Sequence, residues 1–357
     1  MEGSGNEEAT GALLRFGMVI DLNTIWYILV GVLLTGYAIL DGFDLGVGAL
    51  HLFVKKDEHR RLFLNSIGPV WDGNEVWLVT GGGALFAAFP EAYATVFSGF
   101  YLAFMLLLCS LIFRAVAIEF RSKEPWPWWR QMWDVAFSLG SILSAFLIGV
   151  AMGNIVRGVP LDQDGEFAGT FLGLLNPYSL MLGVTTVFLF AMHGGIYLVM
   201  KNEGELHDIV RGWINTLIGL FLTCFIIFNF LTLIYVPHVT EIIRERPWIM
   251  VPAFVSVLLV MNVPREFSAG RDFLAFLSSC GAMFFLMATF GATYYPNMVL
   301  SMPNPENSLT IYNAASSDKT LMIMLIIALI GIPVVLAYTA SIYWIFRGKT
   351  TITSTSY

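Results

Sequence analysis

Long apolar runs separated by short polar stretches dominate the pattern along the chain. A run of about 20 apolar residues can cross the hydrocarbon core of a bilayer as a helix. The nine predicted spans are 24–50, 76–95, 97–118, 133–153, 178–200, 213–236, 248–264, 272–295 and 320–346. Because backbone polar groups in lipid must be paired within the segment, each run is expected to be an α-helix. The pattern therefore predicts an all-α polytopic membrane protein.

The composition excludes several other classes of protein. Of the 357 residues, 57% are apolar and 13% are charged, whereas a soluble chain has about 45–50% and about 25%. This leaves too few polar residues to cover a soluble fold, which excludes a soluble globular enzyme and a disordered chain. The net charge of −7, without a basic stripe to neutralise phosphates, excludes a nucleic-acid partner.

The distribution of basic residues predicts the orientation of the chain in the membrane. With the N-terminus outside, 14 of the 19 Lys and Arg fall in the inner loops, as the positive-inside rule requires. We therefore expect the N-terminus outside and the C-terminus inside. Four tryptophans in the stretch 124–133 are interpreted as an anchor at the membrane interface.

Loop positions and a weak internal sequence similarity predict the organisation of the chain. The first and fifth spans are both followed by Lys, an acid, His and Arg, which suggests two similar halves of four helices with a ninth helix added. Residues 1–20 form a polar, acidic tail that lacks the basic start of a signal peptide. We predict a first four-helix bundle over 21–154 and a second over 155–295, with an outer loop at 155–177. The remaining residues, 296–357, are predicted to form an outer loop, the ninth helix and the inner C-terminus.

Acidic residues within the first span need a physical reason, because a carboxylate in lipid is expensive. Asp41 and Asp44 are three residues apart and share one helix face. Gly42 and Gly46 form a pair of small residues that allows another helix to approach closely. The alternative role for the two acids is helix capping or a salt bridge at the membrane boundary.

A second acidic pair precedes the second span. Asp72 and Glu75 are flanked by Trp71 and Trp77, and apolar bulk beside a carboxyl favours its protonated form, which suits proton exchange. The alternative interpretation is a capping box in which Asp72 caps the helix and Glu75 occupies its third position. A tight hairpin at Pro90 is expected to bring the inner ends of the second and third spans together.

The third span ends in a charged group near the inner interface. Arg114 is followed by four apolar residues and should lie just inside the lipid, where it needs an anion such as Asp44, Asp134 or a haem propionate. Glu119, Ser122 and Asp134 complete the group. Many carboxylates and few cations at one depth are typical of a proton path; the alternative is an ion-paired structural cluster.

Ligands for a redox or metal centre are scarce in the sequence. His193 is the histidine expected well within a span, and a buried histidine of this kind is more often structural than a haem ligand. The three cysteines are single and far apart, and no zinc-protease, serine-hydrolase or P-loop motif occurs. We therefore expect no metal site and no complete catalytic site in this chain.

Several motifs in this order are similar to the signature of subunit II of the cytochrome bd quinol oxidases, over about residues 20–347. They are Asp41–Gly48, Trp71–Trp77, Gly82–Ala88, Phe97–Tyr101, Phe113–Arg114, Phe120–Lys123, Met132–Asp134 and Gly204–His207. The family often has Asp where this chain has Glu119, which keeps the charge and changes the reach by one methylene.

The resemblance implies a haem-free subunit with two four-helix bundles and a peripheral helix in a prokaryotic cytoplasmic membrane. Its partner, subunit I, would carry two b haems and haem d and oxidise quinol with O2; small single-helix subunits and a structural quinone occur in some members. It further implies that Asp72, Glu119 and Ser122 line a proton route from the cytoplasm, which helps to generate a proton motive force. Subunit II would not be catalytic alone.

Two alternatives to this function remain at the level of sequence. A proton-coupled secondary transporter would fit the glycine-interrupted first helix, although its substrate site should lie near the midplane rather than near one interface. A purely structural scaffold for the haem subunit would need no proton path. The expected contact with subunit I uses the first and third helices, since Gly42 and Gly46 permit close approach.

Overall fold

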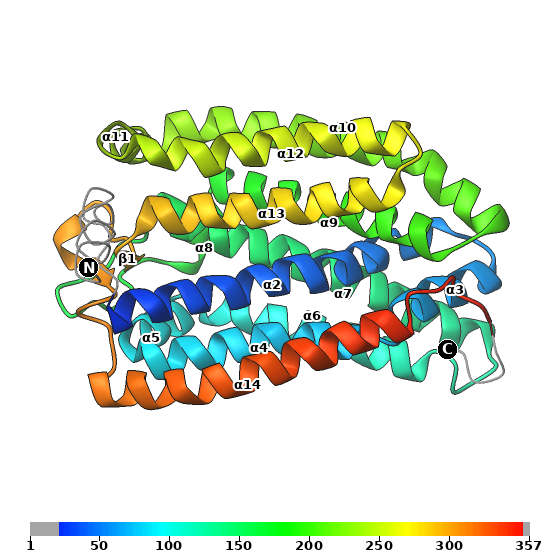
Figure 1. Cartoon of the computed structure of the whole chain (residues 1–357), viewed down its shortest axis with the longest axis horizontal. Coiled ribbons are helices and arrows are strands. Elements are labelled where there is room, and N and C mark those ends of the chain that lie inside the picture. The colour runs from blue at the N-terminus through cyan, green and yellow to red at the C-terminus, as the bar shows by residue number, and fades with distance from the viewer. Residues whose placement is uncertain (1–20, 353–357) are drawn as a thin grey trace, which may run out of the picture.

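A computed structural model of the chain describes residues 21–352, so that the predicted tail 1–20 lies outside the described residues. Long helices run side by side along the molecule (Figure 1). The elements are α2 (Leu22–Leu50), η1 (His51–Phe53), α3 (Asp57–Ile67), α4 (Trp71–Ala88), α5 (Pro90–Gly99), α6 (Tyr101–Phe120), α7 (Pro127–Arg157), α8 (Phe171–Leu174), α9 (Pro177–Lys201), α10 (Gly204–Tyr235), α11 (Pro237–Glu245), η2 (Pro247–Ile249), α12 (Met250–Ser268), α13 (Asp272–Tyr294), β1 (Asn297–Val299), η3 (Pro305–Asn307), β2 (Leu309–Thr310) and α14 (Asp318–Ile345).

The predicted all-α membrane architecture is confirmed. Within residues 21–352, eight helices are long and apolar enough to cross a membrane. The second predicted span corresponds to α4, which is not one of the eight. Its 18 residues include Asp72, Asn74, Glu75 and four glycines, and this composition lowers its hydropathy. A helix of this kind is tolerated in a membrane where protein rather than lipid surrounds it.

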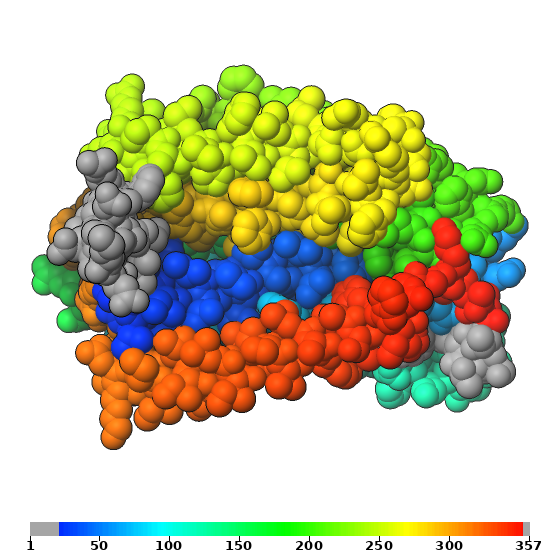
Figure 2. Space-filling model, viewed as in Figure 1, coloured from blue at the N-terminus to red at the C-terminus, as the bar shows by residue number. Residues whose placement is uncertain are grey.

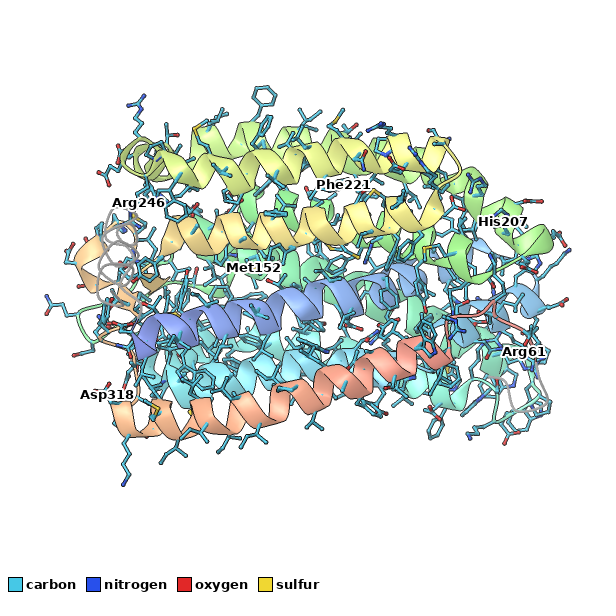
Figure 3. The ribbon with its side chains drawn as sticks, in the orientation of Figure 1. Arg61, Met152, His207, Phe221, Arg246 and Asp318 are labelled. Atoms are coloured by element: carbon cyan, nitrogen blue, oxygen red, sulfur yellow. The ribbon has the colours of Figure 1, made fainter. Side chains whose placement is uncertain are left out.

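The two ends of the bundle differ in composition. Arg61 and His207 lie at one end, whereas Arg246 and Asp318 lie at the opposite end (Figure 3). The first end, which we call the basic end, carries α3, the α9–α10 turn and the C-terminal residues 346–352. The other end, the loop end, carries α5, α11 and the β1–β2 pair. The orientation of the two ends in the membrane stays a prediction.

The connection between the second and third spans differs from the predicted tight hairpin. Pro90 does end the preceding helix, but it begins the ten-residue helix α5 before α6 starts at Tyr101. α5 packs on the loop end, where the Thr95 hydroxyl donates to the Gly165 carbonyl at 2.8 Å. Proline is well placed in the first turn of a helix, because its missing N–H has no partner there.

The centre of the molecule is the crossing of α2 and α9. A Cβ added at Gly46 would lie 1.8 Å from the carbonyl oxygen of Phe190, and one at Gly194 would lie 2.5 Å from the carbonyl oxygen of Phe43. The predicted small-residue groove of α2 is therefore filled by α9 of the same chain, and Gly42 meets the Phe190 ring in the same way. The expectation that these glycines contact another subunit is wrong.

The two predicted halves are joined by direct packing. α2 and α7 both pack against α9, and α13 packs against α2. α12 pairs with α13 and α10 pairs with α9 on the far side. α14 lies along α2 and α4 with most of its surface exposed (Figure 2). The position of a boundary between two four-helix bundles stays a prediction.

The α2–α9 crossing gives a first testable prediction. Gly46→Ala places a methyl group against the Phe190 backbone, so the helices must separate, and the free energy of unfolding should fall by about 1–3 kcal/mol or more. Thermal unfolding of the purified protein in detergent measures this loss. Gly31→Ala in the same helix is the matched control, because no atom lies within 4 Å of its added Cβ. Equal melting temperatures for both variants would contradict the account.

Candidate functional site

The first candidate site surrounds Arg114, which is fully buried in α6. Its Nη2 donates to Oδ1 of Asp41 in α2 at 2.9 Å, and its Nη1 donates to Oε2 of Glu75 in α4 at 3.4 Å. The guanidinium also lies 6.0 Å from the centroid of the Trp71 ring. One buried cation thus ties three helices together near the basic end.

Asp44 joins the same group through polar side chains. The amide nitrogen of Asn74 donates to Oδ2 of Asp44 at 2.7 Å, and the hydroxyl of Tyr343 donates to Oδ1 of Asn74 at 2.8 Å. This chain of contacts attaches the peripheral helix α14 to α4 and α2. Neither Asn74 nor Tyr343 was predicted from the sequence, because neither residue type signals a site without its neighbours.

Three carboxyl groups therefore surround one guanidinium. We call Asp41, Asp44, Glu75 and Arg114 the acid cluster. Asp41 and Asp44 are fully buried, and the Glu75 side chain is 21% exposed. Oδ1 of Asp44 and Nε of Arg114 have no hydrogen-bond partner within residues 21–352. A buried excess of acids over bases is costly unless protons neutralise part of it.

The partners of Arg114 correct one prediction. The sequence pattern predicted Asp44 or Asp134 as the paired anion, whereas the structure pairs Arg114 with Asp41 and Glu75. Asp41 lies nearly three helical turns before His51, the residue that follows α2. Spacing along each helix alone could not show which acid reaches across to α6.

Asp134 forms a second buried cluster at the basic end. It accepts from Nε of Arg121 at 2.5 Å, from Nη1 of Arg60 at 2.8 Å, and contacts Nε2 of His51 at 2.6 Å. Arg121 and Arg130 then share Asp57, at 2.7 Å and 3.2 Å. These contacts hold η1, α3 and the α6–α7 turn in place.

Burial alone would lower the pKa of the Arg121 guanidinium. Its hydrogen bonds to Asp134 and Asp57 outweigh that cost and raise the pKa above its ordinary value, so that Arg121 stays charged. Asp134 is thus matched by two arginines. This second cluster pairs two acids with three arginines, as in a structural ion-pair network, and the sequence did not predict its members His51, Arg60, Arg121 and Asp57.

The three residues of the predicted proton route lie on the surface of this chain. Asp72, Glu119 and Ser122 are all exposed. Asp72 is the second residue of α4, whose N-cap is Val70 without a side-chain hydrogen bond, so the capping alternative is wrong. Trp71 is buried, whereas its neighbour Asp72 is exposed, and the expected apolar cover over Asp72 is therefore not supplied within this chain.

His193 is fully buried in α9 and makes two polar contacts. Its Nδ1 lies 2.7 Å from the hydroxyl of Ser279, and its Nε2 lies 3.1 Å from the carbonyl oxygen of Ile39. Its ring stacks on Phe276 with the centroids 4.6 Å apart. An axial bond to iron would require one of these contacts to break. Within residues 21–352, no three His, Cys, Asp or Glu side chains are grouped as metal ligands.

Comparison with known proteins places the chain in a family. A family model described as cytochrome bd terminal oxidase subunit II matches residues 22–346. The chain is 38% identical over 362 residues to cytochrome bd-I ubiquinol oxidase subunit 2 of Escherichia coli (strain K12), with 92% of this chain and 95% of that protein covered. This chain belongs to the subunit II family of the cytochrome bd terminal oxidases.

Two further relatives agree with this assignment. Cytochrome bd ubiquinol oxidase subunit 2 of Bacillus subtilis (strain 168) is 33% identical over 330 residues, with 92% of this chain and 96% of that protein covered. The structure of bd oxidase from Geobacillus thermodenitrificans has a TM-score of 0.74 at 17% identity, covering 91% of this chain and 98% of that chain. The likeness to the solved structure shows the shared fold.

The acid cluster gives the second prediction. Arg114→Ala leaves Asp41 buried without its cation, which should lower the free energy of unfolding by about 3–5 kcal/mol. Denaturation in detergent measures the loss. Removal of both partners in Arg114→Ala with Asp41→Ala should recover part of it, because no buried charge is then left alone.

The exposed Arg157 at the end of α7 supplies the control. Arg157→Ala should change the free energy of unfolding by less than about 0.5 kcal/mol. A double variant that is as unstable as the sum of the two single variants would mean that Arg114 and Asp41 do not stabilise each other.

Proposed function

We propose that the chain delivers cytoplasmic protons to a haem-bearing subunit I, with which it forms a membrane quinol oxidase that reduces O2 to water. Membership of the subunit II family makes the chain a subunit of a membrane quinol oxidase. The observation that carries the proton-transfer role is the acid cluster beside the exposed Asp72, Glu119 and Ser122 at one end of the helices.

The exposure of these residues supports a route at the boundary between two subunits. Asp72 lies about one turn before Glu75, and Glu119 lies about one and a half turns beyond Arg114. Because Glu75 and Arg114 are in contact at 3.4 Å, side chains of α4 and α6 meet close to both exposed acids. A partner that covered this surface would enclose acids, a hydroxyl and water in one path, as proton transfer requires.

The exposed side of α4 combines small and polar residues with three apolar ones. Its exposed residues are Asp72, Gly73, Val76, Val79, Thr80, Gly83 and Phe86. No atom of the chain lies within 4 Å of a Cβ added at Gly73 or Gly83. By contrast, the exposed side of α12 is large and apolar, with Met250, Phe254, Leu258 and Met261. Small and polar residues favour a helix neighbour, and large apolar ones favour lipid.

The acid cluster would serve the route as a store of protons. Its three carboxyls and one guanidinium carry an excess of negative charge if all ionise, and a buried site resists that state. Glu75 is partly exposed and pairs with the buried Arg114, so it links the surface to the interior. Proton uptake and release can then occur with small movements of side chains.

Two other functions are weaker on these observations. A secondary transporter should bind its substrate near the midplane, whereas the acid cluster and Asp134 lie toward the basic end. A purely structural scaffold would need a cation for each buried acid, which describes the Asp134 cluster but not the acid cluster. The complex would sit in a prokaryotic cytoplasmic membrane, with two b haems and haem d in subunit I.

The third prediction tests the α4 surface. Gly83→Leu fits the isolated chain, since the added side chain starts in open space, but it should weaken the contact with subunit I by about 1–3 kcal/mol through overpacking. Co-purification of subunit I and the haem content report the loss. Gly219→Leu on α10, also exposed and with open space, is the matched control. Full assembly of the Gly83 variant would show that α4 does not contact subunit I.

The fourth prediction tests proton transfer. Asp72→Asn keeps the shape of the side chain but removes the titratable proton, so assembly and haem content should stay normal. O2 reduction should slow by up to about 100-fold, which is the smallest rate effect typical of removing one proton-transfer group. Oxygen consumption and proton uptake in reconstituted vesicles measure this effect. The exposed Glu203, at the α9–α10 turn, gives the control variant Glu203→Gln. Normal turnover in the Asp72 variant would leave this residue without a role in proton transfer.

A further inference from the structure

The peripheral helix α14 reaches the acid cluster through Tyr343. Leu321 is the one buried residue of α14, so little of this helix is enclosed by the bundle. Tyr343 lies in its last turn and is partly buried, and its hydroxyl contacts Oδ1 of Asn74 in α4 at 2.8 Å. Asn74 is itself buried and contacts Asp44. Neither the family assignment nor the proposed proton route gives Tyr343 a role.

The contacts of Asn74 fix the orientation of its side-chain amide. The amide oxygen can only accept a hydrogen bond, and the amide nitrogen can only donate. Nδ2 of Asn74 lies 3.3 Å from the carbonyl oxygen of Leu40, and a backbone carbonyl can only accept. The nitrogen must therefore face Leu40, which leaves the oxygen Oδ1 facing Tyr343. The Tyr343 hydroxyl accordingly donates its hydrogen to Oδ1 and does not accept one from Asn74.

The fixed amide makes the two oxygens of the Asp44 carboxyl group different. The second hydrogen on Nδ2 of Asn74 is donated to Oδ2 of Asp44 at 2.7 Å. In a protonated carboxyl group the carbonyl oxygen is the better acceptor, so this N–H favours Oδ2 as the carbonyl oxygen and Oδ1 as the hydroxyl. Oδ1 has no hydrogen-bond partner within residues 21–352. Oδ1 is therefore the oxygen at which Asp44 can exchange a proton.

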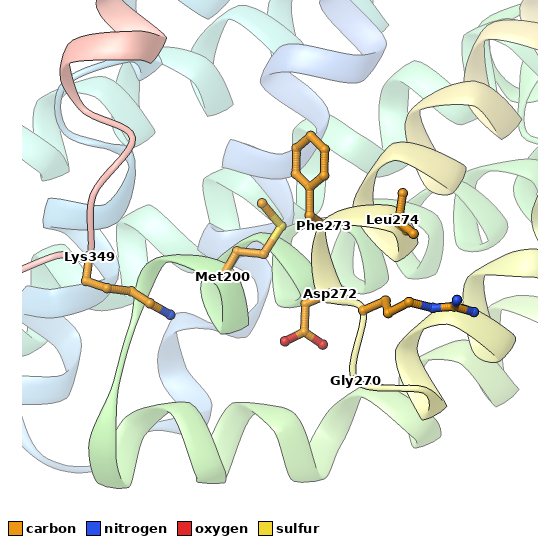
Figure 4. Close-up of a pocket in the computed structure, with 7 residues that line it drawn as sticks. Met200, Gly270, Asp272, Phe273, Leu274 and Lys349 are labelled. Atoms are coloured by element: carbon orange, nitrogen blue, oxygen red, sulfur yellow. The ribbon is translucent and has the colours of Figure 1, made fainter.

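The C-terminal segment fixes the end of α14 that carries Tyr343. Lys201, the last residue of α9, donates to the carbonyl oxygens of Phe346 and Gly348, which follow soon after Tyr343 in the chain. Figure 4 shows this segment, with Lys349 on it, beside the end of α9. The position of the Tyr343 hydroxyl is thus set by contacts at both ends, with Asn74 on one side and with α9 on the other.

We propose that Tyr343 is a positioning residue for proton exchange at Asp44. It locks the amide of Asn74 in one orientation, and the amide in turn keeps the exchangeable proton of Asp44 on Oδ1. The inference rests on the proposed function, in which the acid cluster stores protons. It adds to that function in two respects: α14 becomes part of the proton store, and Asp44 takes up and releases its proton through a single oxygen.

The competing interpretation is that Tyr343 only anchors α14 to α4. The two roles differ in what happens at Asp44 when the hydroxyl is removed. In Tyr343→Phe the ring remains, but the oxygen of the buried Asn74 amide loses its donor, which is costly. The amide is then free to turn its oxygen toward Asp44, and the carbonyl of Asp44 loses the N–H that it accepts. An anchor without a positioning role would leave the hydrogen bond to Asp44 unchanged.

The test is infrared spectroscopy of the complete oxidase complex in water and in heavy water. A carbonyl group that accepts a hydrogen bond absorbs at a lower wavenumber than a free one, so the band of protonated Asp44 reports the N–H of Asn74. The loss of the band in Asp44→Asn identifies it. Tyr343→Phe should move part or all of this band to higher wavenumber, with normal haem content. Asn74→Leu, which has no N–H to donate, should move the whole band in the same direction.

Tyr338→Phe is the matched control, because Tyr338 lies on the same helix and is 64% exposed. Its band should coincide with that of the unchanged complex. The proposal is overturned if the unchanged complex has no band from Asp44, if Tyr343→Phe leaves the band in place or lowers its wavenumber, or if both tyrosine variants move it equally. The proposed function is tested separately by the turnover of Asp72→Asn, which does not depend on Tyr343.

Discussion

The burial of Arg114 is the constraint on which the rest of the site depends. A guanidinium inside a membrane helix requires anions at hydrogen-bond distance, and Asp41 and Glu75 supply them from two other helices. This requirement links the side chains of α4 and α6, while α4 itself packs against α2, although α4 is too polar to count as a membrane span by composition. It also gathers more acids than one cation can balance, and the proposed proton-transfer role rests on that excess.

Glycine supplies the complementary constraint at the centre of the chain. The contact of Gly46 with α9 allows α2 to be buried over its last third, from Asp41 to Leu50. Only a helix enclosed in this way can carry Asp41 and Asp44 without exposing them to lipid. The close packing of α2 and α9 and the acid cluster are thus parts of one arrangement, in which backbone contact makes room for buried charge.

Much of the fold could be predicted from the sequence, because apolar runs of membrane length have few alternative structures. The spans, the loops and the candidate residues Asp41, Asp44, Glu75 and Arg114 were all visible as patterns. The partners across helices were not, because the rotation of each helix about its axis decides which acid reaches Arg114. Element boundaries were also missed: Pro90 was interpreted as a turn but begins α5, and Asp72 was interpreted as a cap although α4 already begins at Trp71.

The central claim is that the acid cluster retains protons at neutral pH because its carboxyl groups outnumber its cations. Infrared spectroscopy of the purified oxidase measures this directly, since a protonated carboxylic acid has a carbonyl band that shifts in heavy water. The account predicts such a band from a buried acid, lost in Asp44→Asn and unchanged in the exposed control Glu203→Gln. A spectrum without a band that depends on Asp41, Asp44 or Glu75 would contradict it.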